Sequence, residues 1–237
     1  AHPDVAKVSF TGSGTVGRRV QQRAAETFKR VTLELGGKGP SIVLPDADLD
    51  LTARGISFGY LLGAGQACIS GTRLLVPEAL HDALVEHLVV LAQSLKAGDP
   101  FDPATTLGPM GSAAHLQRVL GYIEAGQAAG ATLVCGGKQL QVPGFEGGFF
   151  VEPTIFCGVN NQMRIAREEV FGPVLSIIPF DDEDEAYAIA NDSPYGLAAG
   201  LWTGDIARAI RGSAVLEAGT VWVNSYRAVS YMAPFGG

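Results

Sequence analysis

The sequence predicts an α/β protein in which helices cover a sheet in layers. Short runs of β-branched and other apolar residues, such as 31–34 and 174–180, are bounded by Gly, Pro or Asp and are typical of buried strands. Longer stretches between these runs repeat apolar residues at helical spacing. Strands that alternate with helices along a chain favour a largely parallel sheet with helices on its faces.

The expected elements follow one another along the whole chain. Strands are expected at 7–10, 31–34, 74–76, 132–134, 174–180, 198–203 and 220–224, with an extended segment at 149–156. Helices are expected at 16–29, 49–60, 78–95, 112–129, 183–191 and 206–213. Asp46 and Asp48 are both expected to act as N-caps of the second helix. A modest domain boundary is expected near Gly36 and Gly37.

Composition indicates a folded, acidic protein and excludes several functional classes. The chain has 237 residues, 47% of them hydrophobic and 17% charged, which is enough for one large domain or one and a half. A net charge of −7 argues against nucleic acid or an anionic membrane as partner. Three cysteines without a CxxC motif fit neither a disulfide framework nor a zinc ribbon, so no metal site is expected. We expect a cytoplasmic enzyme.

The segment from Gly65 to Gly71 surrounds Cys68 with small residues and is the strongest chemical signal. A lone cysteine is most often a small buried hydrophobe. Here, however, glycines at positions 63, 65 and 71 let the backbone approach a ligand closely, which a packed core cysteine does not need. Upstream, Glu34 begins a Glu-Leu-Gly-Gly-Lys segment and offers a carboxylate that could take a proton from the thiol or from water.

These two segments and four others resemble the aldehyde dehydrogenase superfamily. The other four are Phe10–Ser13, Glu168–Val174, Asn191–Leu197 and Pro234–Gly237, and they fall in the family's order and at roughly its spacing. The resemblance implies a layered α/β/α catalytic domain at 37–237, preceded at 1–36 by the trailing edge of a Rossmann-like coenzyme domain. It also implies a fragment that lacks most of the coenzyme domain and the C-terminal oligomerisation segment.

The resemblance implies that Cys68 and Glu34 are the catalytic residues. The Cys68 thiolate would add to an aldehyde, hydride would pass to a nicotinamide, and Glu34 would activate the water that cleaves the resulting thioester. The backbone N–H of Cys68 would stabilise the oxyanion. The family's side-chain Asn for this oxyanion lies upstream of this chain, and its role is transferred to no residue here.

The resemblance also implies a cofactor, NAD or NADP, with NAD as the family default. Glu169 would hold the nicotinamide ribose and Phe171 would pack near the same ring. Without the Phe-Gly-Pro that follows, the acidic pair at 168–169 would be read as solvated surface. Leu35 and Gly36 are expected to belong to the cofactor site.

A second interpretation of the N-terminal glycines remains open. Residues 12–17 match GxGxxG between an expected strand and helix, and Glu34 lies at about the spacing of a ribose-binding acid. This pattern alone would indicate a dinucleotide-binding oxidoreductase of another family. The aldehyde dehydrogenase interpretation instead places Gly12 and Ser13 at the pyrophosphate, on a helix N-terminus, and keeps Glu34 as the base.

The substrate and the activity of the isolated chain also remain open. The expected partner is a small aldehyde, but the segment from Tyr226 to Phe235, which resembles the family's substrate loop, has mixed polarity and excludes no aldehyde class. A cysteine hydrolase would need a partner histidine, and none of the four histidines lies in a glycine-rich or strand-end context. The full-length protein is expected to be a homo-oligomer, and the isolated fragment a folded domain without activity of its own.

Overall fold

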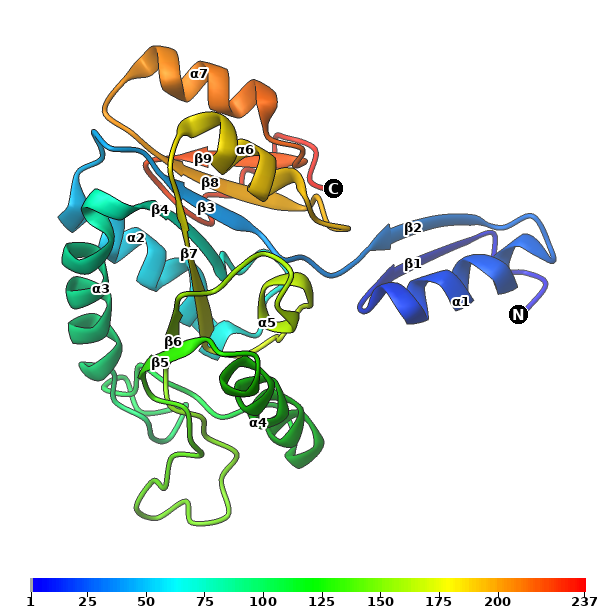
Figure 1. The fold of residues 1–237 in the computed structure, drawn as a ribbon. Coiled ribbons are helices and arrows are strands. Elements are labelled where there is room, and N and C mark those ends of the chain that lie inside the picture. Colours follow the sequence, from blue (N-terminus) through cyan, green and yellow to red (C-terminus); the bar gives the residue numbers. More distant parts are fainter. Residues whose placement is uncertain (1) are drawn as a thin grey trace.

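The computed structural model describes residues 2–237 and contains two separate sheets (Figure 1). Within these residues, the smaller sheet has two parallel strands, β1 (Lys7–Thr11) and β2 (Arg30–Glu34), connected by helix α1 (Gly14–Ala25). The larger sheet has seven strands in the order β5-β6-β7-β4-β3-β8-β9. Residues 35–39 cross from one sheet to the other.

The larger sheet is parallel except at one edge. Its strands are β3 (Pro40–Val43), β4 (Arg73–Pro77), β5 (Thr132–Cys135), β6 (Thr154–Cys157), β7 (Val174–Phe180), β8 (Ala198–Trp202) and β9 (Thr220–Val223). Only β5 runs antiparallel, against β6, among the pairs that the described residues form. The order places β3 and β4 at the centre, so the chain segments that follow them meet near the middle of one sheet edge.

Helices cover both faces of this sheet. The helices are α2 (Leu49–Leu61), α3 (Glu78–Gln93), α4 (Ala113–Ala128), α5 (Arg164–Arg167), α6 (Glu183–Asn191) and α7 (Ile206–Val215). Leu74 and Val76 of β4 share one core cluster with α2 and α3, whereas Leu75 between them belongs to the cluster of α4, α5 and α6. Side chains alternate across a strand, so these two clusters are the two faces of the sheet. The expected α/β/α layering is therefore confirmed.

Tight helix–sheet contact explains a glycine in α2. A Cβ at Gly55 would overlap the indole of Trp202, which is 1% exposed at the end of β8. Burying an aromatic side chain of this size stabilises the fold by a few kcal/mol, roughly 25 cal/mol per Å² of apolar area. The glycine lets the helix lie directly on the indole ring, and the helix fixes the start of the segment that leads to Cys68.

Two expectations about local structure were wrong. Strand β3 at Pro40–Val43 was not expected, although it is buried at the centre of the sheet. Asp48 does cap α2 by accepting from Leu51 N at 3.0 Å, but Asp46 does not share this role. The Asp46 carboxylate instead accepts from Thr203 Oγ1 at 2.9 Å and from Gly204 N at 2.8 Å.

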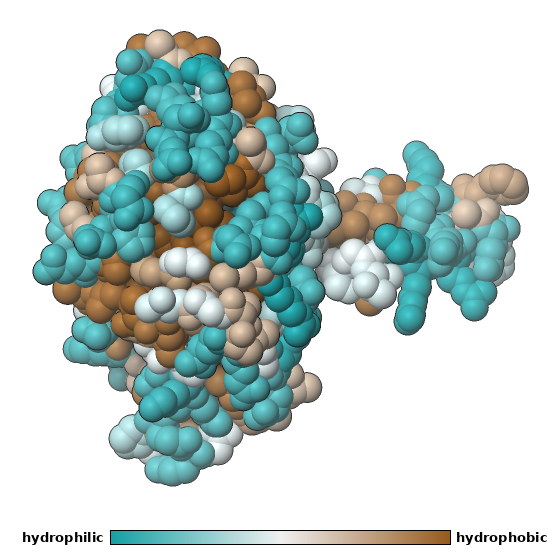
Figure 2. All heavy atoms as spheres, in the orientation of Figure 1, coloured by the Kyte–Doolittle hydropathy of each residue, from teal (hydrophilic) through white to brown (hydrophobic). Residues whose placement is uncertain are grey.

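The lobe formed by β1, α1 and β2 stands beside the larger sheet (Figure 1). In the same orientation, hydrophilic side chains cover much of this lobe, whereas apolar residues gather on the visible face of the larger part (Figure 2). No helix within residues 2–237 is both long enough and apolar enough to cross a membrane.

Candidate active site

A cavity of about 720 Å³ opens between the two sheets. Its lining includes every residue that the sequence analysis assigned to the site except Glu34: Gly12, Ser13, Leu35, Gly36, Cys68, Glu169 and Phe171. These residues come from the lobe, from the segment after α2 and from the segment between α5 and β7. A cavity of this size between two substructures is the usual place for a cofactor or a small ligand.

The backbone before Cys68 adopts an uncommon conformation that presents the thiol. Gly63, Ala64 and Gly65 have φ angles of 65°, 54° and 71°, all in the left-handed region. A non-glycine residue in this region is strained by about 1–2 kcal/mol, and such strain clusters at functional sites. Gly65 is further restricted because a Cβ there would overlap the carbonyl of Gly172. The turn therefore requires glycine at 65 for two independent reasons.

Two adjacent glycines bring the three parts of the site into contact. A Cβ at Gly36 would overlap the Glu169 carboxylate, and a Cβ at Gly37 would overlap the carbonyl oxygen of Cys68. The Gly37 N–H also donates to Glu169 Oε1 at 3.2 Å. The Gly-Gly pair thus allows the lobe, the cysteine segment and the acidic segment to meet without intervening side chains.

The surroundings of Cys68 favour its protonated form at rest. Burial raises the pKa of the thiol above its ordinary value, and the negative charges of Glu169 and Glu34 raise it further. Hydrogen bonds from the backbone N–H groups of Cys68 and Ile69 act in the opposite direction. A base is therefore needed before this thiol can attack a carbonyl.

Glu34 lies beside the cavity rather than in its lining, at the end of β2. Its backbone carbonyl accepts from Gly12 N at 3.0 Å, which fixes the turn that enters α1. Its carboxylate faces the C-terminal segment, where Glu34 Oε1 is 3.6 Å from the position that a Cβ on Gly236 would take. Its negative charge is the smallest of the influences on the pKa of the Cys68 thiol, so the two groups lie within electrostatic reach of each other.

Two polar residues of α4 that line the cavity, His115 and Arg118, were not predicted from the sequence. The His115 ring packs on Phe171 with ring centroids 5.7 Å apart, and Arg118 Nη2 donates to the Glu169 carbonyl at 2.9 Å. Burial lowers the pKa of His115. Spacing of three along a helix predicts a shared face, but only the fold shows that this face borders Cys68.

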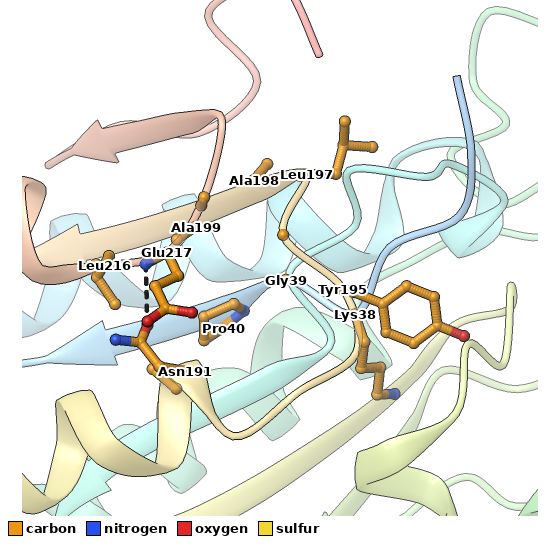
Figure 3. Close-up of a pocket in the computed structure, with 13 residues that line it drawn as sticks. Lys38, Gly39, Pro40, Asn191, Tyr195, Leu197, Ala198, Ala199, Leu216 and Glu217 are labelled. Atoms are coloured by element: carbon orange, nitrogen blue, oxygen red, sulfur yellow. Dashed lines mark hydrogen bonds between the residues drawn. The ribbon is translucent and has the colours of Figure 1, made fainter. Parts of the chain in front are cut away.

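A buried lysine, Lys38, follows Gly36 and Gly37 in the chain. Lys38 is 1% exposed, and its Nζ has no hydrogen-bond partner among the described residues. Burial lowers its pKa to about 7, the Arg73 charge lowers it as well, and the Glu169 charge raises it. Figure 3 shows a second, very small cavity, with Lys38 and Tyr195 on one side and, on the other, Asn191, whose Oδ1 accepts from Glu217 N. With about 10 Å³, that cavity has room for no more than about one water molecule.

Comparisons with known proteins agree with this geometry. Residues 1–237 match the model of the aldehyde dehydrogenase family. Betaine aldehyde dehydrogenases of Brucella melitensis and Mesorhizobium japonicum are each 49% identical over 236 residues, which is 100% of this chain and 48% of theirs. This chain therefore spans about half the length of these relatives.

Solved structures give the same result for the fold. A putative aldehyde dehydrogenase from Burkholderia cenocepacia superposes with a TM-score of 0.97 at 45% identity, over 100% of this chain and 48% of that one. The NAD+ complex of an aldehyde dehydrogenase from Bacillus cereus gives 0.96 at 43% identity, over 100% and 47%. The chain belongs to the aldehyde dehydrogenase family.

Proposed function

We propose that this chain is the catalytic half of an NAD-dependent aldehyde dehydrogenase, which oxidises an aldehyde to a carboxylic acid. The observation that carries the proposal is the cavity in which Cys68 lies together with Glu169, Phe171 and the turn at Gly12. Membership of the family supports it, and so does the NAD+ in similar solved structures. The relatives' substrate, betaine aldehyde, is one candidate among aldehydes.

The proposal divides the chain into two domains. Residues 1–36 belong to the edge of the coenzyme domain and residues 37–237 form the catalytic domain. The separation of the β1–β2 sheet from the larger sheet supports this boundary. A cytoplasmic location and a homo-oligomer of the complete protein belong to the same proposal. They rest on the acidic composition, the sparse cysteines and the family resemblance.

The cavity has features that suit a nicotinamide nucleotide. Ser13 caps α1, so the N–H groups of the first helical turn point toward the cavity side, where a diphosphate would be favoured. The Glu169 carboxylate can accept from ribose hydroxyls, and Phe171 offers a ring face. Gly36 lets that carboxylate lie against the backbone, at a place that any Cβ would overlap. When bound, NAD supplies the hydride acceptor.

The protein's own residues supply the nucleophile and the base. The Cys68 thiol loses its proton and the sulfur adds to the carbonyl carbon, with the Cys68 N–H placed to stabilise the resulting oxyanion. The Glu34 carboxylate accepts the proton, directly or through one water. After oxidation the acid is held on sulfur as a thioester. Glu34 passes the first proton to solvent and then takes a proton from the water that attacks the thioester carbon, so that the C–S bond breaks, the acid leaves and Cys68 is restored.

Rapid kinetics on the complete enzyme test these roles. Glu34→Gln keeps size and hydrogen bonding but cannot accept a proton, and general base catalysis contributes about 10²–10⁴ in rate. We expect the variant to keep thioester formation better than hydrolysis, so that a burst of reduced nicotinamide precedes slow turnover. Cys68→Ala is the matched control and should abolish both phases. Unchanged turnover in Glu34→Gln would show that Glu34 is not the base, and would favour the ribose-binding role of the GxGxxG interpretation.

A second candidate, a folded chain without activity of its own, applies to the 237 residues alone. On the coenzyme side, the described residues include only β1 and β2 of a nucleotide-binding sheet. NAD titration of the isolated chain, followed by calorimetry, should therefore show weak binding or none. Tight binding would favour a working oxidoreductase formed by this chain alone.

A further inference from the structure

The guanidinium of Arg227 spans the segment that carries Cys68. Arg227 lies after β9, and its Nη2 donates to Ser70 Oγ at 2.8 Å. Its Nη1 donates to the carbonyl of Leu62 at 3.3 Å, before the left-handed turn. The side chain thus contacts this segment on both sides of the nucleophile, and the charges of Arg227 and Cys68 interact.

This cation has no carboxylate partner. Arg227 forms no ion pair within residues 2–237. Its Nε is buried and also lacks a hydrogen-bond partner there. Burial lowers the pKa of Arg227, and Tyr226 and Cys68 act in the opposite direction. An anion would stabilise this half-buried guanidinium, because removing a charge from water is costly unless the charge is paired. Neither Tyr226 nor Cys68 is anionic at rest, since burial raises the pKa of both.

We infer that the substrate of the proposed reaction is an aldehyde that also carries a carboxylate, and that Arg227 binds this carboxylate. The inference rests on the proposed role of Cys68 as nucleophile. A guanidinium has five N–H donors in a fixed fork. In Arg227, Nη1 and Nη2 each donate one hydrogen bond to a protein oxygen. Nη1 and Nη2 each keep one further N–H, and these two suit the two oxygens of a carboxylate.

Apolar side chains near Arg227 indicate the rest of the substrate. Leu62, whose carbonyl Arg227 contacts, is 47% exposed, and Val229, two residues after Arg227, is 61% exposed. An aliphatic stem would cover such surface while its two ends reach Cys68 and Arg227. The substrate class is therefore an ω-oxo carboxylate. An aldehyde with a quaternary ammonium group would be opposed by the same cation.

Alkylation of Cys68 tests this inference without cofactor or turnover. Iodoacetate carries a carboxylate and iodoacetamide does not, yet both react with the same thiolate. Mass spectrometry gives the rate of alkylation at Cys68 with each reagent. Changes in thiolate fraction or loop position affect both rates equally, so they cancel when the iodoacetate rate is divided by the iodoacetamide rate. Arg227→Gln, which keeps donors but loses the charge, should lower this ratio about tenfold, as expected for one charge-assisted hydrogen bond. Arg227→Lys is the control and should retain most of it.

The outcomes separate the two levels of the proposal. An unchanged ratio in Arg227→Gln overturns the carboxylate site and leaves Cys68 as nucleophile. Failure of both reagents to label Cys68 in the unaltered protein overturns the proposed function itself. In the complete enzyme, the kcat/KM for 4-oxobutanoate divided by that for butanal should fall about tenfold in Arg227→Gln. The kcat/KM for betaine aldehyde divided by that for butanal should rise in the same variant. A ratio of 4-oxobutanoate to butanal that stays constant would also overturn the inference.

Discussion

Replacing Lys38 with methionine should stabilise the protein, and the gain should depend on pH. Methionine has nearly the length of lysine and needs no hydrogen bond, whereas Lys38 Nζ is buried without a partner among the described residues. We therefore expect Lys38 to destabilise the fold, and any benefit of this lysine must come from its electrostatic effect on the site. Burial raises the pKa of Glu169, and the charge of Lys38 is one of the influences that act in the opposite direction.

The magnitude follows from the pKa of Lys38. Burial, together with the charge of Arg73, lowers the pKa of Lys38 from 10.5 to about 7. At about 1.4 kcal/mol per unit, the folded state is penalised by up to about 5 kcal/mol below pH 7. Between about pH 7 and 10.5 the unfolded state holds a proton that the folded state has released. Stability therefore rises with pH in this window, and the penalty disappears at its upper end.

Urea unfolding of the Lys38→Met variant and the unaltered protein at several pH values between 6 and 10 measures this difference. The variant should be more stable by a few kcal/mol at pH 6, and its advantage should shrink as pH rises. Other groups that titrate in this range cancel in the comparison. Lys96→Met at an exposed lysine controls for added hydrophobicity. A stability difference that does not change with pH would refute the assignment of Lys38 as a buried group of lowered pKa.

Two further predictions concern the nucleophile segment. Limiting iodoacetamide should label Cys68 before the other two cysteines. Burial raises the pKa of all three thiols, but only at Cys68 do backbone N–H groups act in the opposite direction. Peptide mass spectrometry that finds another cysteine labelled first would contradict this. Gly65→Ala should lower the unfolding free energy by about 2–4 kcal/mol and slow Cys68 alkylation, because left-handed strain and overlap with Gly172 add. Gly63→Ala has the left-handed strain but no overlap, so an equal loss of unfolding free energy in that variant would show that the overlap with Gly172 costs nothing.

Elements with complete local signals were predicted well from the sequence. Strand β7 and helix α6 have the expected bounds, since β7 is a long apolar run and α6 begins after Asp182 with three acidic residues in its first turn. Strand β3 was missed because it is short, begins with proline and follows glycines, although its Ile42 and Val43 have high β-propensity. Its place at the centre of the sheet depends on pairing with β4 and β8, which is non-local.

The same limit applies to the site. The glycine-rich and acidic motifs are contiguous in sequence, and the residues they indicated lie around one cavity, although their roles remain predictions. Arg118, by contrast, is joined to the site through Glu169, 51 positions away, and no local pattern indicates that contact. Asp46 shows the opposite error. It has the residue type of an N-cap, but its partner Thr203 lies 157 positions along the chain.

The arrangement around Cys68 favours a thiol at rest and has groups that would stabilise a thiolate in the proposed reaction. Burial and two carboxylates raise the thiol's pKa, which protects it from oxidation, because the thiolate is the reactive form. The groups that favour the anion are backbone N–H groups, whose positions are fixed before any substrate arrives. Fixed donors stabilise a developing negative charge without reorganisation. Holding them in place requires the left-handed turn that ends at Gly65 and the close contact of Gly37 with Cys68. The glycines of this site are therefore part of its chemistry.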